Sequence, residues 1–243
     1  GGSTSNPVET MHDPYEPALG GDSDRLETPR AQFFVDLAGE YVVELQVTDH
    51  YGATAPSDLC PAQPARVRIN ATPDEKFHVQ LTWDTPGDAD QTDEQGTDVD
   101  LHLRHPSAED WFSGDGFDCY FQNQNPDWGR PDHAGDDPSL DIDDVNGAGP
   151  ENINIHDPED TTVLGRGYGI AVHYYSAQAP TLDFDFRVLE STATVRVFID
   201  GQVAWEGERR LRDTNDFWHA ADVHFSGAGS RVVPVDSLAV RSP

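Results

Sequence analysis

Residues 194–207, TVRVFIDGQVAWEG, decide the fold class of this chain. Asp200-Gly201 is a dipeptide typical of a two-residue type I′ turn, and apolar side chains alternate with polar ones on both sides of it. The alternating apolar positions are Val195, Val197, Ile199, Val203 and Trp205. Because a period of two residues is that of a half-buried strand, the stretch predicts a β-hairpin with one face in a hydrophobic core.

The same period of two recurs along much of the chain. It is found in residues 41–48, 65–70, 78–83, 98–104, 168–175, 182–188 and 217–225. In the last of these segments we expect one face to carry Phe217, His219, Ala221, Val223 and Phe225. No segment shows a convincing 3.6-residue period over ten residues, so the sequence predicts an all-β protein.

Composition and charge narrow the function classes. The 243 residues are only 36% hydrophobic, and they carry 45 acidic against 15 basic residues, for a formal charge of -30. Such a field repels phosphate backbones and anionic membrane surfaces and attracts cations, so we expect no nucleic-acid partner. No run of 18 apolar residues is present, so we also expect no membrane span.

Residues 139–153, SLDIDDVNGAGPENI, concentrate oxygen donors on a segment that must turn. The glycines and the proline force it to fold back, and the spacing does not match an EF-hand. Ca²⁺ accepts six to eight oxygen ligands in flexible geometry, so it is the simplest cation to place here. The expected ligands are Asp141, Asp143, Asp144, Asn146 and Glu151, and the alternative is a solvated acidic turn.

The segment TDVDLHLRHP supplies a second set of carboxylates. Val99, Leu101 and Leu103 are expected to point into the core, which places Asp98 and Asp100 together on the opposite face. We expect these two aspartates to converge with the 141–152 loop on one or more Ca²⁺ ions; the alternative is an open, solvated sheet face. A second cation site would use Asp88, Asp90 and Asp93, unless that segment is simply a charged, flexible loop.

The sequence gives less support to a zinc site or to a hydrolase active site than to a calcium site. A zinc site would use His102, His105, His173 and an aspartate, but His102 and His105 are an odd number apart and should point to opposite faces of a strand. No G-x-S-x-G elbow is present, and the carboxylates lie among other acids instead of in the apolar pocket that a glycosidase acid needs. We therefore expect a protein that is not an enzyme.

A long insertion, residues 106–138, is aromatic and has no clear period. Its aromatic side chains argue against disorder, and Trp111, Tyr120 and Trp128 could stack on sugars or pack into the core. The chain contains two cysteines, Cys60 and Cys119, both in loop-like surroundings. An even count in an acidic chain predicts one disulfide in an oxidising compartment; two unpaired thiols are the alternative.

Residues 38–57, AGEYVVELQVTDHYGATAPS, resemble the last hairpin of a PKD-type (polycystic kidney disease repeat) immunoglobulin-like module. The matching positions are Gly39, Tyr41, Val43, Leu45, Val47, Asp49 and Gly52. The earlier strands of such a module would lie upstream of Gly1, so the resemblance implies an incomplete sandwich. Because proteins usually cover an unpaired sheet edge, another chain could supply the missing partner; a trimmed precursor is the alternative.

Residues 77–225 are similar to an uncharacterised bacterial family of YfaP-like secreted β-domains. The similarity is carried by three motifs in order: VQLTWDTPG…GTDVDLHLRHP, SLDIDDVNGAGPENI, and YGIAVHYYSA followed by ATVRVFIDG. It implies a β-sandwich on an extracellular or envelope protein, beside adhesive or immunoglobulin-like modules. The acidic insertion at 84–97 and the aromatic loop at 106–138 are larger than is usual in this family.

Together these patterns predict an incomplete immunoglobulin-like sandwich module followed by a larger β-sandwich with long acidic loops. We expect the first module at residues 1–72, a calcium-binding sandwich at 77–228, and a tail or edge strand at 229–243. The expected function is that of a secreted or cell-surface calcium-binding protein in adhesion, matrix or surface assembly, whose partners are calcium and other copies of itself or surface glycans. Alternatives are an extracellular fibre subunit assembled by strand complementation, a carbohydrate-binding module, and a metal-dependent hydrolase.

Overall fold

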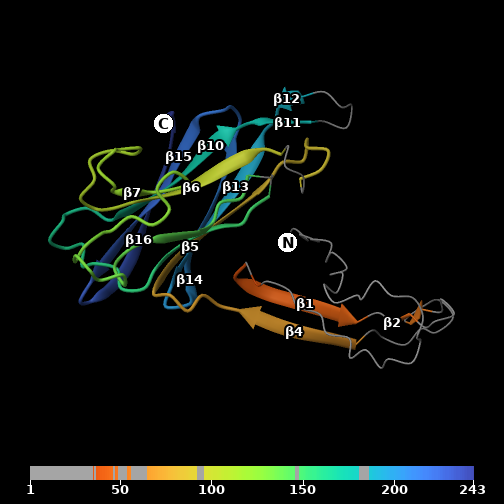
Figure 1. Cartoon of the computed structure of the whole chain (residues 1–243), viewed down its shortest axis with the longest axis horizontal. Helices are drawn as coiled ribbons and strands as arrows, with labels where there is room; N and C mark the ends of the chain where they lie inside the picture. Colours follow the sequence, from red (N-terminus) through yellow and green to blue (C-terminus); the bar gives the residue numbers. More distant parts are fainter. Residues whose placement is uncertain are drawn as a thin grey trace, which may run out of the picture. The chain divides into compact units, whose positions relative to one another are not determined.

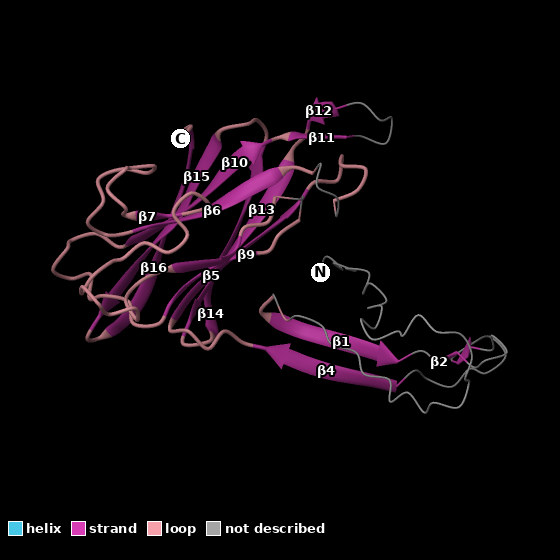
Figure 2. Cartoon of the chain, viewed as in Figure 1, coloured by secondary structure: helices cyan, strands magenta, loops and turns pink. Residues whose placement is uncertain are grey.

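The computed structural model describes residues 35, 37–45, 47–48, 54–55, 65–91, 96–145, 148–180 and 186–243. The chain divides into two compact units, Gly1–Asp36 and Leu37–Pro243. All regular elements in the described part are β-strands, which confirms the predicted all-β class (Figure 2). None of the described residues belongs to a helix long and apolar enough to cross a membrane.

Ten of the described strands form two five-stranded antiparallel sheets (Figure 1). The first sheet has the order β14-β13-β5-β9-β8 and the second has the order β16-β15-β10-β6-β7. The first consists of β14 (Gln202–Leu211), β13 (Ser191–Ile199), β5 (Phe77–Asp84), β9 (Glu151–Ile155) and β8 (Ser139–Ile142). The second consists of β16 (Gly229–Val240), β15 (Asp216–Ser226), β10 (Tyr168–Ser176), β6 (Asp98–Arg104) and β7 (Asp118–Cys119). The segment 229–240 is therefore an edge strand.

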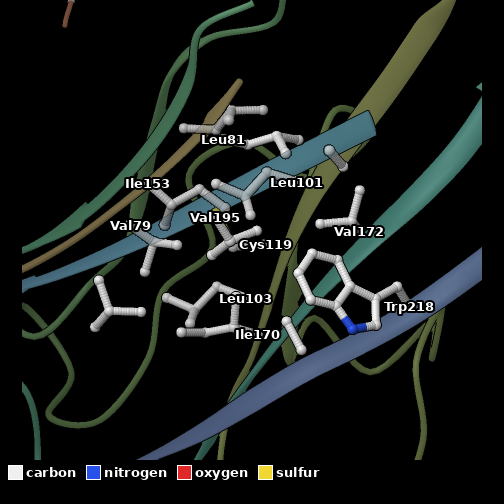
Figure 3. Packing of buried hydrophobic residues seen from close by; sticks show 14 of the residues in the cluster. Val79, Leu81, Leu101, Leu103, Cys119, Ile153, Ile170, Val172, Val195 and Trp218 are labelled. Atoms are coloured by element: carbon white, nitrogen blue, oxygen red, sulfur yellow. The ribbon is translucent and has the colours of Figure 1, made fainter. Parts of the chain in front are cut away.

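The core lies between these two sheets, which makes the unit a β-sandwich. Figure 3 shows Val79, Leu81, Ile153 and Val195 of the first sheet facing Leu101, Leu103, Ile170, Val172 and Trp218 of the second. These side chains come from alternating positions of their strands, as a period of two requires. Their burial provides the apolar contact that holds the sheets together.

The hairpin that decided the fold class forms as predicted. β13 and β14 pair in an antiparallel register across Asp200-Gly201. Both turn residues have positive φ, 49° for Asp200 and 72° for Gly201, as a type I′ turn requires. Asp200 also donates its N–H to the carbonyl of Lys76 at 2.9 Å, which joins the turn to the start of β5.

The expected face of residues 217–225 is only half correct. The pairing of β15 shifts between His219 and Ala221, where the strand carries a β-bulge. An extra residue at a bulge reverses the alternation. Trp218 therefore joins the core before the bulge, Ala220 at it, and Val223 and Phe225 after it. Phe217 consequently points to the outer face of the sheet, where it contacts the aromatic loop.

Three smaller antiparallel pairs complete the described strands. They are β1 (Gly39–Leu45) with β4 (Ala65–Ala71), β2 (Val47–Thr48) with β3 (Thr54–Ala55), and β11 (Gln178–Pro180) with β12 (Phe186–Val188). Only the end of the predicted strand 182–188 is described, as β12. Among the described strands β1 pairs only with β4, and the resemblance to an immunoglobulin-like module stays a prediction.

Candidate metal centre

The aromatic loop, residues 106–138, covers part of the outer face of the second sheet. Its Trp111 lies so close to β10 that a Cβ added to Gly169 would be 3.0 Å from the indole ring. Phe112 has a positive φ of 54° and donates its N–H to Asp118 Oδ2 at 2.8 Å. As a result, Asp100 and His102 of β6 are 2% and 0% exposed even though they point away from the core.

One edge of β6 is capped by a side chain instead of a strand. The short β7 pairs only with Leu103 and Arg104. Two residues earlier, the N–H of Leu101 donates to Glu151 Oε2 at 2.6 Å. Glu151 is fully buried and belongs to the same row of β9 as the core residue Ile153. A carboxylate of the first sheet therefore reaches a strand of the second.

The segment before Glu151 is held against β5. Trp83 donates its N–H to the carbonyl of Ala148 at 3.1 Å. Gly149 has a φ of 78°, and a Cβ there would be 2.9 Å from the Trp83 ring and 3.1 Å from the Leu81 carbonyl. The positive φ and the lack of room for a Cβ both favour glycine at this position. The segment can therefore run close to β5 immediately before Glu151.

The two acidic segments converge, as the sequence analysis expected. Asp100 of β6, Asp143 of the loop after β8, and Glu151 of β9 each place a carboxylate oxygen within 4.8 Å of the others. Asp98 and Asp144 act on the same group electrostatically. We call these five residues, Asp98, Asp100, Asp143, Asp144 and Glu151, the carboxylate centre. Oxygens of three of them, Asp98 Oδ1, Asp100 Oδ2 and Glu151 Oε1, are buried without a hydrogen-bond partner.

Negatively charged carboxylates within 4.8 Å of one another repel, and this repulsion favours the protonated state of each carboxyl group. Burial, followed by repulsion from Asp100, Asp143 and Asp144, raises the pKa of Asp98 to about 8. Burial and then the Asp100 carboxylate also raise the pKa of Glu151 well above its ordinary value. The pKa of Asp143 is raised for the same two reasons. A bound cation would remove this penalty by replacing the protons with a charge shared among all the carboxylates.

Not every expected ligand belongs to the centre. The carboxylate of Asp141 accepts a hydrogen bond from Ser139 Oγ at 3.3 Å and another from the Asn154 side chain. Asn154 in turn contacts His78 Nδ1 at 2.5 Å, so Asp141 faces a different set of partners from Asp143. Asp141 lies within β8, and Asp143 follows the strand's end. Asn146, the remaining expected ligand, lies outside the described residues.

The second predicted cation site is not assembled by the part of the chain that the structure describes. The N–H of Asp90 donates to Asp88 Oδ1 at 3.2 Å, which is a local turn contact. No described group of three or more metal-ligating side chains includes either residue. Asp93 lies outside the described residues, so this site stays a prediction.

A second group of metal-ligating side chains was expected only in part. Asp100, His102 and His173 each offer one ligand atom within 4.8 Å of the others, and all three are buried. His105 is directed elsewhere, as the strand spacing predicted: its Nε2 contacts Glu159 at 2.6 Å, and its Nδ1 accepts from the Ser107 N–H at 3.1 Å. His173 lies directly opposite Asp100 in the β6–β10 register, which the sequence alone did not give.

The aromatic residues that could stack on sugars or pack into the core make packing contacts within the protein. Trp128 is 1% exposed and donates its Nε1–H to the carbonyl of Gly116 at 2.8 Å. Trp111 is 6% exposed and packs on Phe217. Tyr120 stacks on the His102 ring with centroids 4.7 Å apart. Two of the three rings are thus covered by the protein itself, which favours the alternative of packing within the structure over a sugar platform.

The predicted disulfide is also wrong. Cys119 is a free thiol and is fully buried in the core, where its Sγ lies 3.5 Å from the carbonyl of Gln124. Burial raises the pKa of this thiol, which keeps it protonated and unreactive. β7 places Cys119 between the sheets, so it cannot tie the aromatic loop to another segment. Cys60 lies outside the described residues.

Comparison with known proteins identifies no similar protein. No protein-family model matches the chain, and neither a curated protein nor a solved structure does. The similarity to YfaP-like domains therefore stays a prediction.

Proposed function

We propose that this chain is a calcium-binding β-sandwich protein of the cell surface or extracellular space, with a structural or adhesive role and no enzymatic activity. The observation that carries this proposal is the convergence of Asp100, Asp143 and Glu151 from separate segments. A cluster of acids alone would be weak support. Here Asp100 and Glu151 are almost fully buried, and each has an oxygen without a hydrogen-bond partner.

The donor set favours Ca²⁺ among the common cations. The carboxylate centre offers only oxygen ligands, which suit hard cations such as Ca²⁺ and Mg²⁺. Its members come from β6, from the start of β9 and from the two residues that follow Ile142 at the end of β8. Ca²⁺ tolerates such irregular geometry and takes bidentate carboxylates, whereas Mg²⁺ demands a near-ideal octahedron. We therefore expect Ca²⁺ to bind more tightly than Mg²⁺.

A cation at this place would brace the sandwich. Glu151 belongs to the first sheet and Asp100 to the second, so one ion would link the two sheets. Among the described residues, this part of β6 pairs with β10 on one side and with no strand on the other. Such a link suits a surface protein that must hold its shape in a calcium-rich medium. The formal charge of -30 supports the same assignment, because it concentrates cations near the protein.

Isothermal titration calorimetry of the full chain, stripped of metal, tests the proposal. We expect Ca²⁺ to bind to the wild type and binding to be lost or strongly weakened in Asp143→Asn. Asp213→Asn is the matched control, because it makes the same change at an exposed aspartate after β14. Absence of Ca²⁺ binding to the wild type, or equal loss in both variants, would show that the proposal is wrong.

A second candidate, the fibre subunit, is supported by the β1–β4 ribbon. Val42, Leu45 and Val67 are 49%, 58% and 59% exposed, which is unusual for strand residues of this size. Exposed apolar strands are templates for pairing with another chain. Electron microscopy and light scattering at increasing protein concentration should show polymers that Leu45→Glu abolishes. A wild type that stays monomeric throughout would eliminate this candidate.

A further inference from the structure

The histidine group, which consists of Asp100, His102 and His173, lies beneath the aromatic loop on the outer face of the second sheet. Asp100 and His102 are two residues apart on β6 and therefore share a face. In β10, His173 pairs with Asp100, and Ala171 pairs with His102. The two histidines are thus diagonal neighbours on adjacent strands, and the small Ala171 lies opposite His102 on the same face.

Each histidine has one ring nitrogen in contact with a hydrogen-bond acceptor and one ring nitrogen without a hydrogen-bond partner. His102 Nδ1 lies 3.1 Å from both oxygens of Asp118, which favours the tautomer with its proton on Nδ1. His173 Nε2 faces Asn215 Oδ1 at 3.4 Å. The other nitrogens, His102 Nε2 and His173 Nδ1, are buried without a hydrogen-bond partner, and so is Asp100 Oδ2.

We propose that Asp100, His102 and His173 form a binding site for a divalent transition metal of the Zn²⁺ type. The three atoms without a hydrogen-bond partner belong to the residues whose ligand atoms lie within 4.8 Å of one another. Asp100 Oδ2 and His173 Nδ1 are 3.4 Å apart. Two ligands in tetrahedral zinc coordination, at about 2.0–2.1 Å from the ion, are about 3.3 Å apart, so this pair already has the required spacing.

The surroundings of the group resemble those of metal-binding histidines. A ligating imidazole usually donates its second N–H to a carboxylate or carbonyl that fixes its orientation. Asp118 provides this contact for His102, and it also accepts the N–H of Phe112, so one residue holds both the ligand and its cover. The rings of Phe112 and Phe217 lie within 6.1 Å of His173, centroid to centroid, and exclude competing water.

The donor set separates this site from the carboxylate centre, and the inference does not rest on the calcium proposal. Imidazole nitrogens suit Zn²⁺ and related ions, whereas Ca²⁺ selects oxygen. Three protein ligands would leave a fourth position of a tetrahedral ion for water or another small ligand. Asp100 belongs to both groups, so variants that separate the two sites must avoid it.

Competition against a chromophoric zinc chelator, with Zn²⁺ alone as the probe, tests the proposal on the full chain. We expect one tightly bound equivalent in the wild type, in Asp143→Asn and in His156→Gln. His156 is the matched control because it is an exposed histidine outside the group. His173→Gln should lose this equivalent and keep Ca²⁺ binding, so failure of this inference is distinguishable from failure of the calcium proposal.

Asp118→Asn measures the positioning role of the carboxylate behind His102. Loss of such an outer partner typically weakens metal affinity 10- to 100-fold, and removal of the ligand in His173→Gln should weaken it more. Cobalt(II) in place of zinc should give visible absorption bands in the wild type that disappear in His173→Gln.

Nitrogen-15 NMR of the wild-type histidine rings removes any dependence on a variant that fails to fold. Zn²⁺ should shift His102 Nε2 and His173 Nδ1 and leave His105 unchanged. A wild type that binds no zinc equivalent, zinc binding that survives His173→Gln, or zinc that perturbs only exposed histidines would each overturn the proposal. In that case His173 and Asp100 would form only a buried polar contact beneath the aromatic loop.

Discussion

Glu151→Gln tests the carboxylate centre with the smallest change of side-chain shape. Glutamine has the shape of a protonated glutamate, and its side-chain oxygen can still accept the Leu101 N–H that Glu151 accepts at 2.6 Å. The exchange therefore keeps the contact that caps β6 and removes one charged ligand of the proposed ion. Its effects with and without Ca²⁺ should accordingly be very different.

In the metal-free protein the expected effect is small. Two unit charges 4.8 Å apart repel by about 3.5 kcal/mol at an effective dielectric constant of 20, and Glu151 lies within this distance of both Asp100 and Asp143. Protonation avoids that cost, which is why the pKa of Glu151 is raised by burial and by Asp100. Because Glu151→Gln fixes the neutral state, its unfolding free energy should stay within about 1 kcal/mol of the wild type or exceed it.

In the presence of Ca²⁺ the expected effect is large. At a concentration 100 times the Kd, a bound ligand stabilises the folded state by about 2.7 kcal/mol. For a unit of this size that corresponds to a rise in Tm of about 5–10 °C. If loss of the charged ligand weakens binding 100-fold, the same Ca²⁺ concentration contributes only about 0.4 kcal/mol, or roughly 1 °C.

Thermal unfolding followed by circular dichroism, in EGTA and in Ca²⁺, measures both effects. Glu208→Gln, an exposed position on β14, is the control and should respond to Ca²⁺ like the wild type. The reasoning is refuted if Glu151→Gln keeps the full Ca²⁺ response. It is also refuted if the variant is several kcal/mol less stable in EGTA, because Glu151 would then be stabilising as a charged residue without an ion.

Three further predictions address pH and packing. Burial beside other acids raises the pKa of Asp98 to about 8, whereas an unfolded aspartate titrates near about 3.9. Between these two pKa values the metal-free folded state therefore holds one proton more than the unfolded state, so its unfolding free energy falls as the pH rises. Asp98→Asn should flatten this pH dependence of the unfolding free energy, measured by urea unfolding at several pH values. Trp128→Ala should cost about 3–5 kcal/mol in the same assay, because Trp128 is 1% exposed, whereas the exposed Val203→Ala should cost under about 0.5. Cys119 should react with a thiol reagent only at the rate of unfolding, so labelling of Cys119 in folded protein, read by peptide mass spectrometry, would contradict its placement in the core.

The strands were predictable because their signals are local. Asp200-Gly201 encodes its turn through two positive φ angles, and the row from Tyr168 to Tyr174 faces the core as its alternation predicts. Phe217 was misplaced because a bulge leaves no mark in a period of two. Trp111 and Trp128 lie in a loop without a period, where only the folded chain decides what covers them.

The candidate site could be predicted in part for a related reason. Asp98 and Asp100 share a strand face, and the 139–153 loop is rich in the same kind of ligand side chain. Carboxylates brought together by a fold need a cation or protons to offset their repulsion, so a shared cation site could be inferred from these two segments. Asp141 was included because loop spacing does not say where β8 ends. His173 joins Asp100 and His102 through the pairing of β6 with β10, and sheet order is a long-range property that no single segment encodes.

The position of the carboxylate centre follows from how the sandwich closes. β7 covers only two residues of β6, so the remaining edge would present unpaired backbone groups. Glu151 satisfies one of them, the Leu101 N–H, but in doing so it brings a carboxylate beside Asp100 and Asp143. Without a cation these carboxylates repel one another unless they hold protons; a bound cation would instead join the two sheets through the same residues. The ion would thus be needed where the Glu151 side chain, and not a neighbouring strand, accepts a hydrogen bond from the edge of β6. Because Glu151 belongs to the first sheet and β6 to the second, the site lies at the junction of the two sheets.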